Sequence, residues 1–113
     1  MQQILISPMD VVFKQTYLKE LYIDGKCSDK QHRYQPPIVK KYIHVIDLMK
    51  VSQNVLQLTK YGSLHYEHLH GNKEGLSSVR VNDQYRIEFT EEMRAEELIA
   101  TIVNITELSN HYN

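Results

Sequence analysis

The stretch "LHYEHLHGN", residues 64–72, contains three of the six histidines in the chain: His65, His68 and His70. Imidazoles suit both metal binding and proton transfer, because a neutral ring is a common zinc ligand and histidine titrates near neutral pH. In a strand, His68 and His70 share one side and His65 points to the other, so a three-ligand metal site needs a bend. No Cys or carboxylate motif supplies a fourth ligand, and we expect neither a metal nor another cofactor. Two interpretations stay open: at least one histidine transfers protons, or all three are half-exposed strand residues.

A second chemical feature is the pair of arginines in "SSVRVNDQYRIEF", residues 77–89. If the apolar residues of both strands face the core, the loop must be residues 82–84, and Arg80 then lies opposite Arg86. Like charges in this position cost up to about 1 kcal/mol, so something must compensate them. Glu88 lying diagonally between the arginines is one candidate. An anionic partner, a phosphate or an acidic peptide, is the other, since a guanidinium binds such groups with two hydrogen bonds.

The elements that position these residues follow from hydrophobic periodicity and turn signals. The first part is expected to form a short strand at Gln3–Ile6, a helix from Pro8 to Asp24 capped by Ser7 and ended by Gly25, a polar connector, and a helix from Pro36 to Ser52. The period changes to two after residue 61, which predicts strands at "YEHLHG", "SSVRVN", "YRIEFTEE" and Leu98–Ile105. The last is apolar on both faces, as is typical of a strand in the middle of a sheet. Helices first and an antiparallel sheet afterwards predict an α+β fold.

Composition limits the class of protein. At 113 residues the chain is about one domain long, so residues 1–113 are expected to form a single domain. It is 42% hydrophobic and 24% charged, with no apolar run long enough to cross a membrane and no signal-peptide pattern in "MQQILISPMD". The net charge of −1 argues against a protein that coats nucleic acid, so any contact with RNA must be a local basic patch. The single Cys27 excludes an intrachain disulfide.

The run "HLHGNKEGLSSVRVNDQYRIEF", residues 68–89, resembles the HigB-type toxins of the RelE/ParE superfamily. In those toxins a Leu-x-Gly turn precedes a Ser-x-Arg-x-Asn strand and a Tyr/Trp-Arg-Ile strand. The ending "NHYN", residues 110–113, is similar to the Asp-Tyr-His or His-Tyr endings of the superfamily. The positions shared with the first motif are Leu69, Gly71, Gly75, Ser78, Arg80, Asn82, Tyr85, Arg86 and Phe89.

The resemblance implies a RelE-like fold, in which a short N-terminal strand and two helices precede a mainly antiparallel, twisted sheet of about four strands. It also implies a cytoplasmic toxin of a type II toxin–antitoxin system, with no membrane association. Such a toxin enters the ribosome and cleaves translated mRNA without a metal, by attack of the ribose 2′-oxygen on the neighbouring phosphorus. Its partners are the ribosome, mRNA and a cognate antitoxin, expected to be a helix-turn-helix DNA-binding protein encoded by a neighbouring gene.

Site residues can be carried over where positions match. Arg86 falls on the family's arginine that stabilises the scissile phosphate, and His70 falls where relatives have a basic residue before the glycine. The chain departs from the family in two places: His68 sits one position later than the family's His-Pro-Leu, and His111-Tyr112 replaces Asp-Tyr-His. The resemblance therefore implies catalytic roles for Arg86, His68, His70, His111 and Tyr112, and RNA contacts for Arg80 and Asn82. Lys73, one of several surface lysines that could line an RNA approach, is a further predicted RNA contact.

Two other functions remain compatible with the sequence. A ParE-like protein of the same fold would poison DNA gyrase without any proton-transfer residue. A decayed toxin would only bind its antitoxin or operator complex. Cleavage of mRNA would distinguish the endoribonuclease toxin from both of these alternatives.

Overall fold

The computed structural model describes residues 8–110, and its sheet has five strands in the order β1-β5-β4-β3-β2. β1 runs parallel to β5, and the other neighbours are antiparallel. The α+β class is confirmed, but the sheet has five strands where about four were expected, because an N-terminal strand, β1, joins it. No helix within this range is long and apolar enough to cross a membrane. The elements are β1 (Asp10–Phe13), α1 (Thr16–Asp24), α2 (Pro36–Val51), β2 (Glu67–His68), β3 (Ser77–Arg80), β4 (Tyr85–Glu92) and β5 (Ile102–Asn110), with 3₁₀ turns at Lys30–His32, Val55–Lys60, Gly62–Leu64 and Gly71–Lys73.

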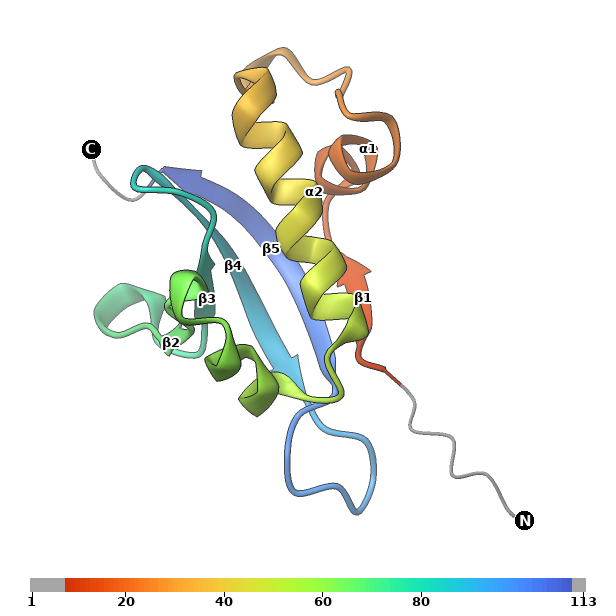
Figure 1. Ribbon diagram of the computed structural model, residues 1–113, viewed down its shortest axis with the longest axis vertical. Coiled ribbons are helices and arrows are strands. Elements are labelled where there is room, and N and C mark those ends of the chain that lie inside the picture. Colours follow the sequence, from red (N-terminus) through yellow and green to blue (C-terminus); the bar gives the residue numbers. More distant parts are fainter. Residues whose placement is uncertain (1–7, 111–113) are drawn as a thin grey trace.

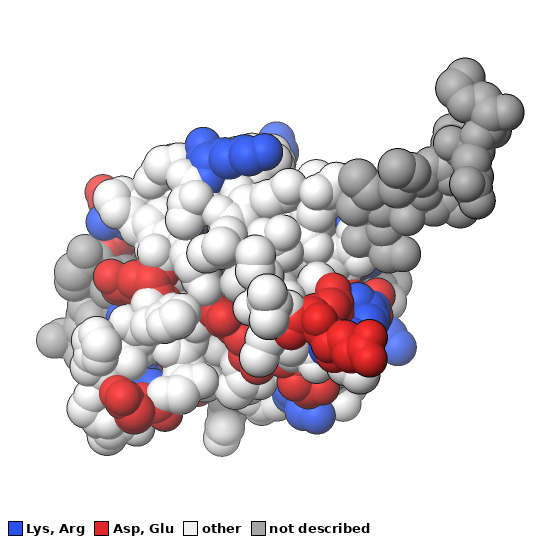
Figure 2. Space-filling view, turned by 90° about the horizontal axis from the view of Figure 1, so that it is seen from below, with Lys and Arg blue, Asp and Glu red and all other residues white. Residues whose placement is uncertain are grey.

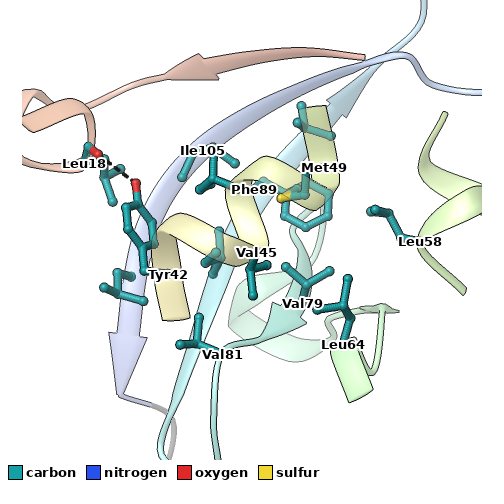
Figure 3. Packing of buried hydrophobic residues seen from close by; sticks show 14 of the residues in the cluster. Leu18, Tyr42, Val45, Met49, Leu58, Leu64, Val79, Val81, Phe89 and Ile105 are labelled. Atoms are coloured by element: carbon teal, nitrogen blue, oxygen red, sulfur yellow. Dashed lines mark hydrogen bonds between the residues drawn. The ribbon is translucent and has the colours of Figure 1, made fainter. Parts of the chain in front are cut away.

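Both helices lie on one face of the sheet, and α2 crosses that face diagonally (Figure 1). The helix predicted from Pro36 to Ser52 is confirmed as α2, and Tyr42, Val45 and Met49 on its inner face are all fully buried. Figure 3 shows these side chains packed against residues of β3, β4 and β5. The Tyr42 hydroxyl donates a hydrogen bond of 2.7 Å to the carbonyl oxygen of Leu18, which ties α2 to α1 inside the core. The sheet face opposite the helices is therefore the one left for a functional site.

The N-terminal helix prediction was partly wrong. A helix starting at Pro8 does not form, because Asp10–Phe13 is strand β1 and pairs in parallel with Ile102–Ile105 of β5. α1 begins at Thr16 and ends at Asp24. Its cap is Gly25, whose φ of 75° is the left-handed conformation that glycine adopts readily, so the predicted end of the helix is confirmed. The predicted strand Gln3–Ile6 and the Ser7 cap lie outside the described residues.

The last strand was predicted too early in the chain. β5 starts at Ile102, not Leu98, and it continues to Asn110. Residues 93–101 instead form a loop in which Leu98 is 94% exposed. The loop is closed by a hydrogen bond of 3.1 Å from the Thr101 N–H to the Glu92 carbonyl oxygen. The position of this strand in mid-sheet, between β1 and β4, is confirmed.

The arginine hairpin has the predicted register. Arg80 is the partner of Arg86, and the Val81 N–H donates to the Tyr85 carbonyl oxygen at 2.9 Å, which leaves residues 82–84 as the loop. The Asn82 Oδ1 atom accepts hydrogen bonds from the N–H groups of Gln84 and Tyr85, at 2.8 Å and 2.7 Å, and thereby shapes the turn. By contrast, the predicted strand "YEHLHG" is reduced to the two residues of β2 at the sheet edge.

Candidate functional site

Arg86 lies on the sheet face away from the helices. Its neighbours in β4, Ile87 and Tyr85, both belong to or pack against the core, and successive side chains of a strand point to opposite faces. The antiparallel register places Ser109 of β5 beside Arg86, and Glu107 beside Glu88. This end of β4 and β5 therefore presents only polar side chains on its outer face.

Glu88 organises the cations of this face. Its side chain is 2% exposed, and the Lys73 ammonium lies 2.9 Å from each of its two carboxylate oxygens. Arg86 donates from Nε to Glu88 Oε2 at 3.0 Å. A buried carboxylate is costly unless it is paired, and here two cations from separate segments pair with it. The carboxylate interpretation of the arginine pair is thus confirmed for Arg86.

The contact with Glu88 does not involve the two terminal nitrogens of the Arg86 guanidinium. The contact uses Nε, and among the described residues no hydrogen bond is found for the two terminal nitrogens of Arg86, whose side chain is 18% exposed. Two parallel N–H groups are the geometry that recognises a phosphate. Glu88 therefore holds a guanidinium whose two terminal nitrogens make no hydrogen bond to residues 8–110.

Arg86 lines an open hollow of about 560 Å³, a volume within the usual range for small-ligand sites. Lys73 enters it from the 3₁₀ turn Gly71–Lys73, and the described end of β5 forms its floor. His32, from the connector between the helices, also lines this hollow and was missed by the sequence analysis. The residues around it are His32, Lys73, Arg86, Glu107, Leu108, Ser109 and Asn110.

Two tyrosine hydroxyls fix the connector to β5. β1 pairs with β5 only as far as Ile105, so the following part of that strand edge lacks a backbone partner from β1. There the Tyr17 hydroxyl accepts a hydrogen bond from the Leu108 N–H at 3.1 Å, and the Tyr34 hydroxyl donates to the Leu108 carbonyl oxygen at 2.9 Å. Burial raises the pKa of Tyr17 and of Tyr34, so both hydroxyls stay protonated in the neutral range. His32 is thereby held at a defined place beside the hollow.

His68 belongs to a different cluster on the other side of the sheet. It pairs with Ser77, which pairs with the buried Phe89, so this side chain lies on the same face as the helices. Glu91 is the centre of this cluster: it accepts hydrogen bonds from the hydroxyls of Ser77, at 2.6 Å, and Tyr66, and His68 Nε2 lies 3.4 Å from its carboxylate. Among the described residues that line the hollow of Arg86, neither His68 nor His70 is found.

The other predicted site residues are placed as follows. His70 is 86% exposed and lies 3.7 Å from Glu74, beside His68 at a separate hollow of about 350 Å³. Arg80 lies 3.9 Å from Asp83. His111 and Tyr112 lie outside the described residues. Within residues 8–110, no three His, Cys, Asp or Glu side chains are arranged to hold a metal ion.

The basic patch that RNA binding was expected to need is therefore local and mixed with acidic groups. Lys73 and Arg86 meet Glu88 and Glu107 at the hollow. At the opposite end of the molecule, which carries the β4–β5 loop, acidic side chains form several separate patches and basic ones gather mainly at the rim (Figure 2). Among the described residues that this view shows, the positive charges are not continuous.

Solved structures of other proteins share this fold. A YafQ mutant from E. coli superposes with a TM-score of 0.53 at 11% identity, over 91% of this chain and 93% of that one. A YoeB/ParE toxin from Agrobacterium tumefaciens gives a TM-score of 0.51 at 16% identity, over 92% of this chain and 100% of that one. At these identities the likeness concerns the fold alone, which is that of the RelE-like toxins.

The sequence identifies the family within this class. Residues 11–104 match the HigB-like toxins, described as RelE-like toxins of type II toxin–antitoxin systems. Toxin HigB-1 of Vibrio cholerae serotype O1 is 33% identical over 82 residues, which is 72% of this chain and 82% of the relative. The chain belongs to the HigB-like toxin family, and the resemblance drawn from residues 68–89 is confirmed.

Proposed function

We propose that this toxin is an endoribonuclease that cleaves translated mRNA on the ribosome, in the cytoplasm and without a metal. The observation that supports the proposal best is Arg86, which Glu88 holds through Nε beside a hollow, with no hydrogen bond from its two terminal nitrogens to any described residue. A fixed guanidinium costs little reorganisation when charge develops on a phosphate, and this is how electrostatic stabilisation of a transition state works. Lys73 and Arg80 add positive charge on the same face.

The reaction is a transesterification within the RNA strand. The ribose 2′-oxygen forms a bond to the neighbouring phosphorus, while the bond from phosphorus to the leaving 5′-oxygen breaks. A base takes the 2′-hydroxyl proton and an acid gives a proton to the leaving oxygen, so the products carry a 2′,3′-cyclic phosphate and a 5′-hydroxyl. His111 and Tyr112 follow directly in sequence on Asn110, which lines the hollow, and they remain predicted proton-transfer residues. The roles predicted for His68 and His70 also remain predictions.

The partner we propose is an antitoxin encoded by a neighbouring gene, because membership of a toxin–antitoxin family implies one. It would be a small helix-turn-helix protein that neutralises the toxin by binding it. Copurification of the two proteins after joint expression of the neighbouring genes tests this part of the proposal, and a toxin that purifies alone would contradict it.

The test of the proposed function is induction of the Arg86→Ala variant beside the wild type. Wild-type induction should arrest growth and create new transcript 5′ ends inside codons, whereas Arg86→Ala should lose both effects by about 10²-fold or more. Arg94→Ala is the matched control, since Arg94 also pairs with a carboxylate, that of Asp10, but lines a different hollow. A folded Arg86→Ala protein that still cleaves mRNA would refute the site.

The wild-type result also distinguishes the alternative functions. Damaged DNA with intact mRNA would point to a gyrase inhibitor, and harmless wild-type expression to a protein that only binds.

A further inference from the structure

His32 is held in place on two sides. Its ring stacks on that of Tyr17 with centroids 3.7 Å apart and an angle of 9° between the planes. Its Nδ1 atom lies 2.7 Å from Asp29 Oδ2. Asp29 is itself fixed, because its other oxygen accepts the Gln31 N–H at 2.9 Å at the start of the 3₁₀ turn Lys30–His32. A surface histidine in a polar connector would not need such constraints.

The Asp29 contact selects one form of the imidazole. The bond with His32, and after it the bond from the Gln31 N–H, lowers the pKa of Asp29, so this carboxylate is ionised and only accepts hydrogen bonds. The proton between the two residues is therefore on Nδ1 of His32. In the neutral ring the lone pair is then on Nε2, for which no hydrogen bond is found within residues 8–110. The side chain is 31% exposed and lines the hollow of Arg86.

A base of this kind and the Arg86 fork line the same hollow. The His32 ring contacts Tyr17 of α1 and Asp29. Lys73, Arg86 and Glu107 line this hollow with it. Other titratable or charged groups line a second hollow that His32 also borders: Lys26, Cys27, Arg33 and Tyr34. His32 is the histidine among the described lining residues, and histidine is the side chain whose charge changes between about pH 5 and 8.

We propose that His32 is the general base of the cleavage reaction and that Asp29 is its positioning residue. This inference rests on the proposed function. His32 Nε2 takes the proton of the ribose 2′-hydroxyl as the 2′-oxygen bonds to phosphorus and the bond to the leaving 5′-oxygen breaks. Asp29 stabilises the imidazolium that results, and Arg86 stabilises the charge on the phosphorane oxygens. The proton that the leaving oxygen requires comes from a separate acid, for which Tyr112 and His111 are the predicted candidates.

The experiment is single-turnover cleavage of mRNA on purified, programmed ribosomes between about pH 5 and 8. His32→Phe keeps an aromatic ring against Tyr17 but has no nitrogen, and it should lower the rate by about 10²-fold and remove the decline of the rate at acidic pH. Asp29→Asn should reduce the rate less and displace that decline. His44→Phe, at an exposed position of α2, is the matched control with unchanged kinetics.

Chemical rescue separates proton transfer from packing. His32→Ala opens space beside Tyr17, and added imidazole should restore part of its cleavage rate but none of the rate of Arg86→Ala. Thermal unfolding verifies that each variant is folded, and His32→Gln replaces His32→Phe if the latter is not. The inference is overturned if the folded His32 variant keeps the wild-type rate and acidic decline while Arg86→Ala has lost cleavage, a result that leaves the proposed function standing. Full activity in both variants would instead refute the proposed site, and a wild-type protein that does not cleave mRNA would refute the proposed function.

Discussion

Glu88 and Glu91 lie three residues apart in β4 and are the centres of two unlike clusters on opposite faces of the sheet. Glu88 is paired with two cations, Lys73 and Arg86, at 2.9 Å and 3.0 Å. Glu91 instead accepts hydrogen bonds from two neutral hydroxyl groups, those of Ser77 and Tyr66. An odd spacing in a strand puts the two carboxylates on different faces, so one strand serves two environments.

The difference shows why the arginine face is the better candidate for phosphate chemistry. Around Glu91 the donors are used up by the carboxylate, and His68 is the exposed member of that cluster. Around Glu88 the carboxylate accepts a hydrogen bond from one nitrogen of Arg86, and within residues 8–110 no hydrogen bond is found for the two terminal nitrogens. A carboxylate surrounded by hydroxyls is a structural network, whereas a carboxylate that holds a guanidinium by one edge also orients it for binding.

The largest expected effect comes from removing both cations of Glu88. Lys73→Met with Arg86→Met leaves a buried carboxylate without a partner, and such losses cost about 3 to 5 kcal/mol in the free energy of unfolding. Each single variant should cost less than half of this, since the remaining cation still pairs with Glu88. Urea unfolding at neutral pH measures the loss.

Two controls make this first prediction specific. Adding Glu88→Gln to the double variant should restore most of the stability, because a neutral amide is cheaper to bury than a carboxylate. Arg94→Met removes a cation whose partner, Asp10, is 61% exposed, and it should cost no more than about 1 kcal/mol. A double variant as stable as Arg94→Met would show that Glu88 does not depend on its cations.

The second expected effect concerns the hydroxyl cluster at alkaline pH. Burial, and after it the hydrogen bond to Glu91, raises the pKa of Tyr66 above its ordinary value of 10.0. The neutral phenol is thus favoured in the folded state, and its contribution is present below about pH 10 and is lost as the pH rises above it. Tyr66→Phe should cost about 1 to 3 kcal/mol at pH 7 and then lose stability less steeply than the wild type above pH 10. Parallel curves for the two proteins would contradict this.

Local sequence patterns predicted the elements that are determined locally. Pro36 and the apolar spacing from Tyr42 to Met49 located α2, and the loop 82–84 fixed the register of Arg80 with Arg86. β1 was missed because its parallel partner, β5, lies at the other end of the chain and no local period reports such pairing. The start of β5 was predicted too early for another reason: Leu98 and Ile99 are apolar, as in a strand, but they belong to an exposed loop.

The candidate site was predictable only in its β-hairpin part. Arg86 was found from a motif, and Glu88 from the rule that like charges need compensation. His32 was not, because nothing in "DKQHRYQ" indicates that Tyr17 and Tyr34 bind the edge of β5 and carry the connector to the hollow. His68 is excluded from this site because successive side chains of a strand point to opposite faces, and the register places His68 on the face opposite Arg86.

The smallest expected effects are those of His68→Gln and His70→Gln, and they test the comparison between the two faces directly. His68 is 67% exposed and His70 is 86% exposed, each beside a carboxylate, and such exposed pairs are worth about 0 to 1 kcal/mol. Because both line a hollow separate from that of Arg86, we expect each variant to cleave mRNA within about twofold of the wild-type rate. Removal of a general acid or base would instead lower the cleavage rate by about 10²-fold or more. The same single-turnover assay measures this beside His32→Phe. A loss of cleavage in a folded His68→Gln or His70→Gln protein would instead support their predicted catalytic roles, and would require the substrate to reach both faces of the sheet around the β2 edge.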